Sequence, residues 1–166
     1  AEDVPFHFTV YPLARTTVLL SDKLYRYRMT EGSLTHVYNA RNSREKKLEQ
    51  HLQVLASIFT SWRSHGIGAL CPEQMVTWCL DFTLFDLLGV APEVGAACAR
   101  RLSSLLCDMY GPSWWQLPRD AAVRRAARAV AEAKPNGITL GKVDLMRFFV
   151  ATRGLAQCVE RVFRRG

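Results

Sequence analysis

A chain of 166 residues that is 49% hydrophobic and 22% charged has the length and composition of one globular domain with a proper core. Polar side chains interrupt its most apolar region, residues 75–88, so no segment reaches the ~18 to 20 consecutive apolar residues of a membrane span. The net charge of +7 indicates either a polyanionic partner, such as nucleic acid or an acidic membrane surface, or a charge that only keeps the chain soluble.

Residues 1–42 predict an extended segment or small β-hairpin and a connector. Apolar residues alternate with others at 6–10 and again at 24–29, on either side of a plausible turn at 21–23, and such alternation is typical of strands. Residues 30–42 are rich in Thr, Ser, Gly and Asn, which favours a connector.

The second predicted strand carries an aromatic and basic run. A strand that displays Tyr25 and Tyr27 beside Arg26 and Arg28 could stack bases and hold phosphates. Alternation, however, puts the tyrosines on one face and the arginines on the other. We therefore favour tyrosines in the core and arginines in water.

Residues 43–166 predict helices. Apolar side chains recur at intervals of three and four, and prolines and glycines suggest helices from about 43 to 66, from 72 to 89 and from 92 to 111. Six residues on the apolar stripes of these helices are expected to be buried together: Leu55, Phe59, Trp78, Phe82, Leu102 and Leu105.

The C-terminal part predicts a helix rich in Ala and Arg and a broken final segment. The Ala-Arg helix is expected to begin at Pro118 and to end at residues 135–137. Apolar residues at 143–151 and 155–163 do not share one stripe, so we expect a break near Gly154. The whole predicts a mainly α, compact domain of about five to six helices over residues 1–166.

The termini and cysteines suggest an origin for this domain. The first residues lack the basic start and apolar run of a signal peptide, and the sequence neither begins with Met nor ends on a natural boundary. We therefore expect a domain cut from a longer protein, or a processed product, and an intracellular location, cytoplasmic or nuclear. The five cysteines show no CxxC spacing and are expected to be free thiols, Cys71, Cys79, Cys98, Cys107 and Cys158.

The Ala-Arg helix is the first candidate site. Residues 84–166 hold thirteen Lys and Arg against seven Asp and Glu, whereas residues 1–83 hold nine against eight, so the basic surface is expected on the C-terminal half. Guanidinium groups bind phosphates as bidentate forks. The competing interpretation is a solvated face. The candidate nucleic-acid-binding residues are Arg124, Arg125 and Arg128, extended by Arg147, Arg161, Arg164 and Arg165.

A basic cluster and a pair of tryptophans are two further candidate ligand contacts. Arg44, Lys46 and Lys47 fall in the first turn of a predicted helix, where cations oppose the helix dipole, so either an anionic ligand or nearby glutamates would relieve them. Trp114 and Trp115 are adjacent and point ~100° apart on a helix, so one is expected to anchor the core while the other can face a partner or a base. For the two tryptophans, core or helix-start packing is the favoured interpretation.

No catalytic signature is present. Residues 137–143 have three residues between their glycines where a phosphate-binding loop needs four, and Val143 replaces the required Ser or Thr. The histidines are scattered singly, which predicts no metal site. We therefore expect a non-catalytic module without a cofactor.

The leading hypothesis is a helical module that binds nucleic acid, RNA or single strands in preference, by neutralising phosphates with little base reading. The alternative is a protein-interaction or oligomerisation domain that uses an apolar groove between helices and an exposed aromatic, Trp114 or Trp115. Such a composition suits a viral nucleoprotein as well as a cellular adaptor.

Overall fold

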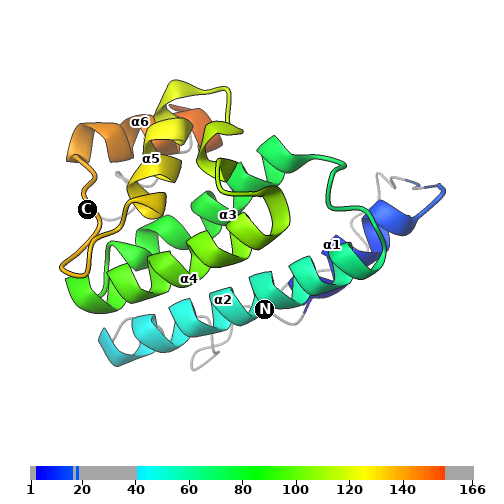
Figure 1. Cartoon of the computed structure of the whole chain (residues 1–166), viewed down its shortest axis with the longest axis horizontal. Coiled ribbons are helices and arrows are strands. Elements are labelled where there is room, and N and C mark those ends of the chain that lie inside the picture. The colour runs from blue at the N-terminus through cyan, green and yellow to red at the C-terminus, as the bar shows by residue number, and fades with distance from the viewer. Residues whose placement is uncertain (1–2, 17, 19–40, 156–166) are drawn as a thin grey trace.

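The computed structural model of the chain describes residues 3–16, 18 and 41–155. These residues form six α-helices and one short 3₁₀ helix, with no strand among them, so the predicted mainly α fold is confirmed (Figure 1). The elements are α1 (Asp3–Leu13), α2 (Arg41–Ser64), α3 (Pro72–Leu87), α4 (Pro92–Tyr110), η1 (Trp114–Gln116), α5 (Ala121–Ala131) and α6 (Lys142–Arg153).

The helices are arranged in three layers. α1 packs on α2, α2 packs on both α3 and α4, and α5 packs on the opposite side of α3 and α4 and carries α6. Figure 1 shows α2 along one side of the molecule and α5 with α6 on the other. In this part of the chain, no helix combines the length and apolar character needed to cross a membrane.

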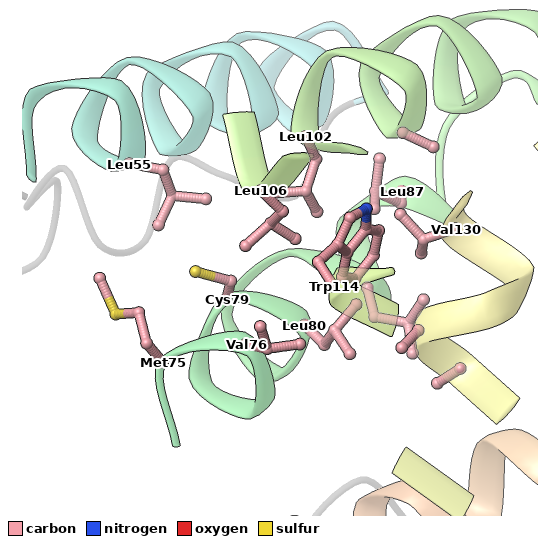
Figure 2. Packing of buried hydrophobic residues seen from close by; sticks show 14 of the residues in the cluster. Leu55, Met75, Val76, Cys79, Leu80, Leu87, Leu102, Leu106, Trp114 and Val130 are labelled. Carbon is pink, nitrogen blue, oxygen red and sulfur yellow. The ribbon is translucent and has the colours of Figure 1, made fainter. Parts of the chain in front are cut away.

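α3 is in the middle layer because its sequence is apolar on most sides. Pro72 occupies its first turn, where a missing N–H costs nothing, and Glu73 in that turn complements the helix dipole. Eight of its residues are buried, which lets it pack on α2, α4 and α5 at once. Figure 2 shows its side chains meeting Leu55 of α2, Leu102 of α4 and Val130 of α5 in one cluster.

The core prediction is correct for half of its residues. Leu55, Phe59 and Leu102 are buried as predicted. The other three pack against the core but are only partly buried, namely Trp78, Phe82 and Leu105. At this margin of the core the Trp78 and Phe82 rings stack with their centroids 4.9 Å apart, and the Phe8 ring lies tilted against Trp78.

The strand predicted at residues 6–10 is wrong, because these residues lie in α1. The alternation of Phe6, Phe8 and Val10 resembled a strand, but strand propensity is weak and tertiary packing overrides it. The centroids of the Phe8 and Trp78 rings are 4.2 Å apart. The Phe8 carbonyl accepts a 2.7 Å hydrogen bond from the Trp62 indole. The remainder of the predicted hairpin and most of its connector, residues 19–40, lie outside the described residues.

Three predicted helix ends are confirmed. α2 ends just before Gly66, and α4 and α6 end at Gly111 and Gly154. Gly111 and Gly154 have φ angles of 83° and 78°, which residues with a Cβ rarely adopt. The break expected near Gly154 is therefore a helix end.

Candidate nucleic-acid interface

α5 owes its start and its position to a few small and polar residues. The Asp120 carboxylate accepts hydrogen bonds from the backbone N–H groups of Ala122 and Val123, at 2.8 and 3.0 Å, and so caps the helix. The helix therefore begins three residues after the predicted start at Pro118. Buried small side chains, Val123, Ala126, Ala127 and Val130, face α3 and α4 and leave the arginines on the outside.

Arg124 is bound to the loop that precedes α5. Its Nε donates to the Pro118 carbonyl at 2.9 Å and a terminal nitrogen donates to the Arg119 carbonyl at 3.2 Å. These bonds give two backbone oxygens of the loop a hydrogen-bond partner. Arg124 therefore contributes to holding the loop, a role that sequence reasoning did not find.

Arg125 links the two helices of the outer layer. Its guanidinium donates to a carboxylate oxygen of Asp144 at 2.6 Å, so α5 is tied to the first turn of α6. The side chains remain 52% and 32% exposed. An ion pair this exposed contributes at most ~1 kcal/mol, so a phosphate could compete for the arginine.

Arg128 contacts both a carboxylate and an aromatic ring. Its Nε donates to Glu132 at 2.8 Å, one turn further along α5. The guanidinium carbon lies 5.2 Å from the centroid of the Trp115 ring, over its face. The Arg128 side chain is 59% exposed, so this Arg-Trp pair is on the surface.

The two tryptophans have different environments. Trp114 is 1% exposed and lies in the centre of the core (Figure 2), so it presents no surface to a partner. Trp115 is half-buried and packs against the core while its ring meets Arg128. Of the two tryptophans, Trp115 therefore remains the candidate contact for a ligand.

Charge is distributed unequally among the layers. Residues 117–155, which we call the basic layer, hold eight Lys and Arg against three Asp and Glu, whereas residues 41–116 hold seven against seven. Several cations of the basic layer are exposed, Arg119, Arg124, Arg125, Arg128, Lys134, Lys142 and Arg147. Arg119 is paired with Glu73 but is 91% exposed. A count of charges over residues 117–155 would have added Arg119, Lys134 and Lys142 to the candidate residues before the fold was known.

The other predicted arginines and the second basic cluster differ in outcome. Arg161, Arg164 and Arg165 lie outside the described residues. The cluster at the start of α2 does not converge on a ligand: Arg44 donates to the Gly89 carbonyl at 3.0 Å, and Lys47 lies 2.9 Å from Asp86. Lys46 is exposed.

The structure also buries a histidine beside a carboxylate, a contact that the sequence did not reveal. His51 of α2 is 8% exposed, stacks on Phe82 at 3.9 Å, and places Nδ1 3.6 Å from the Asp86 carboxylate that pairs with Lys47. Burial, with Lys47 acting in the same direction, lowers the pKa of His51 to about 4. The imidazole is therefore neutral near pH 7 and acts in packing.

The described cysteines are free thiols, as predicted, at positions 71, 79, 98 and 107; Cys158 lies outside the described residues. Burial raises the pKa of the Cys79 and Cys98 thiols, which makes both poor nucleophiles. Within the described ranges, no group of three or more His, Cys, Asp or Glu is placed to hold a metal ion.

Comparison of the chain with protein families, with curated proteins and with solved structures gives no match. Function is therefore inferred from the chemistry of this surface.

Proposed function

We propose that this chain binds nucleic acid through the basic layer, without catalysis, by neutralising backbone phosphates. The observation that supports it is the concentration of charge: a net charge of +5 over residues 117–155, against zero over residues 41–116. Unequal charge of this kind steers polyanions to one face of a molecule. α5 and α6 are on the side of α3 and α4 opposite α2, so this face is separate from the neutral layers.

The intramolecular partners of the arginines are compatible with this role. Arg125 and Arg128 pair with carboxylates at the surface, where an ion pair contributes at most ~1 kcal/mol. A phosphate that approaches Arg125 would replace Asp144, whereas the terminal nitrogens of Arg128 can donate to a phosphate while Nε keeps its bond to Glu132. Neutralised phosphates release the condensed counterions of the nucleic acid, which is the main source of sequence-independent affinity. We assign phosphate contact to Arg119, Arg125, Arg128 and Arg147, and a mainly structural role to Arg124.

The test is charge reversal in matched pairs. Arg128→Glu with Arg147→Glu changes the basic layer, and Lys46→Glu with Arg63→Glu makes the same change of net charge on α2, where both residues are exposed. Binding of a labelled oligonucleotide is measured for both variants across a salt series. We expect the first pair to lose affinity about equally for all sequences and to flatten the salt slope by roughly one unit per lost contact.

The control pair is expected to keep both the affinity and the slope of the wild type. Equal losses in the two variants would show that only total charge matters, and would contradict a site on the basic layer. Absence of wild-type binding at low salt would remove the proposal.

That last outcome would favour the alternative, a protein-interaction domain. An open hollow of about 590 Å³ lies at the end of α2 and the end of α4 and is lined in part by Trp62, Met109, Tyr110 and Leu117. Leu70, in the loop before α3, is 64% exposed. A size measurement on the same samples distinguishes self-association from a monomer.

A further inference from the structure

The basic layer holds two guanidinium groups over aromatic rings, Arg128 over Trp115 and Arg153 over Phe149. The Arg153 side chain is only 19% exposed and is bonded to Asp81, whereas Arg128 is 59% exposed, so the Trp115 and Arg128 pair is the one that faces solvent. A guanidinium over an indole, at 5.2 Å from the ring centroid, is held by the attraction between a cation and the face of an aromatic ring. Trp115 belongs to η1, which packs on α5, so the ring is fixed to the same helix that carries Arg128. The Arg128 guanidinium, which is itself planar, is thus backed by the Trp115 ring.

Glu132 holds this surface in one orientation. Its carboxylate accepts a hydrogen bond from Nε of Arg128 at 2.8 Å, from the next turn of α5. Because the bond is made by Nε, the terminal nitrogens of the fork can donate to a ligand. A planar cation fixed on both an edge and a face loses little freedom when a ligand stacks on it.

We infer that an unpaired nucleobase stacks on this Trp115 and Arg128 platform, so that the ligand of the basic layer is single-stranded nucleic acid. The inference rests on the proposed function. Proteins that bind single strands combine a basic surface for phosphates with aromatic or guanidinium planes for the bases. The bases of a duplex are stacked on each other and cannot reach such a plane, so the platform provides selectivity that phosphate contacts lack.

The platform is tested with Arg128→Lys, which keeps the charge but removes the plane. Arg63→Lys on α2 is the matched control, since it is the same substitution on an exposed arginine outside the basic layer. The probes are a short oligothymidine and a duplex of equal length, at the same salt. We expect wild type to prefer the single strand, and Arg128→Lys to bind it roughly tenfold more weakly while the affinity for the duplex and the salt slope change little.

Trp115→Leu provides a second reading, because it keeps an apolar side chain against the core and removes the ring below the guanidinium. It should lose the same preference, provided that its circular dichroism matches wild type. If wild type binds single strand and duplex equally, or if Arg128→Lys keeps the preference, the platform is wrong while nucleic-acid binding stands. If wild type binds neither probe, the proposed function itself fails.

Discussion

At the scale of single residues, His51 shows how burial changes the chemistry of a side chain. No sequence pattern singles out His51, because the four histidines are separate along the chain. The structure brings it against Phe82 and near Asp86 on the neighbouring helix. Desolvation is the first cause of its lowered pKa, and the attraction of Asp86 offsets only part of this effect.

The pH dependence of stability follows from this lowered pKa. The pKa of His51 falls from 6.5 to about 4 on folding, so the unfolded chain takes up a proton between these values and the folded chain does not. The stabilisation is fully present above about pH 6.5 and is lost as the pH falls toward 4, by roughly 3 kcal/mol in all.

We expect urea unfolding to show this loss in wild type between about pH 7.5 and about pH 4.5, and His51→Gln to lose clearly less, since Gln does not titrate. An equal loss in both proteins would show that other groups cause it.

At the scale of elements, the contact between α3 and α4 depends on a glycine. A Cβ placed on Gly95 would lie 2.3 Å from the Leu87 carbonyl oxygen at the end of α3. Gly to Ala within a helix usually stabilises it by about 1 kcal/mol. Here the backbone of α3 would have to move, so we expect Gly95→Ala to destabilise the protein by roughly 1 to 3 kcal/mol and to lower its melting temperature by several degrees.

Gly141 is the matched control. It is the N-cap residue of α6, and a Cβ there would lie 3.7 Å from an Asp144 carboxylate oxygen, an ordinary contact. Gly141→Ala should cost about 0.5 to 1 kcal/mol, because alanine is a poorer N-cap residue than glycine, and should require no movement of the backbone. A raised melting temperature in Gly95→Ala would mean that the two helices are further apart than described.

Elements also show which features the sequence could predict. α3 and α4 begin at the predicted prolines and α4 ends at Gly111, because proline and glycine act through local backbone geometry. α1 was mistaken for a strand because its conformation depends on packing against Trp62 and Trp78, which are distant in sequence. Local rules therefore located the boundaries of α3 and α4, missed those of α5 by a few residues, and failed at α1, where a distant contact decides.

The same distinction applies to the candidate site. The arginines of α5 could be recognised from composition and spacing alone. The partners of Arg125 and Arg128, and the choice between Trp114 and Trp115, depend on how η1, α5 and α6 come together. No pattern in the sequence carries that information, so the planar pair could not be predicted before the fold was known.

At the scale of the whole molecule, the three layers are not equally held. The middle layer shares its core with helices on both sides, and α3 alone buries eight residues. α6 fully buries only Phe148. Its other contacts are partly exposed: Leu145 and Phe149 pack at the margin of the core, and Arg153 and Arg125 form the ion pairs with Asp81 and Asp144. Segments with few buried apolar contacts open at lower free energy than the core. The basic layer is therefore expected to open at α6 without unfolding of α3 and α4.

Amide hydrogen exchange on two variants tests this order of opening. Phe148→Ala and Leu102→Ala each remove a side chain that is 0% exposed, the first on α6 and the second in the middle layer on α4. We expect α6 to exchange faster than α3 in wild type, since local opening ranges from near zero to the full unfolding free energy. Phe148→Ala should then accelerate exchange in α6 and leave α3 nearly unchanged.

Leu102→Ala should cost roughly 2 to 5 kcal/mol and accelerate the most protected amides of α3 and α4. If both variants accelerate all helices alike, the layers unfold as one unit and α6 is as firmly held as the centre.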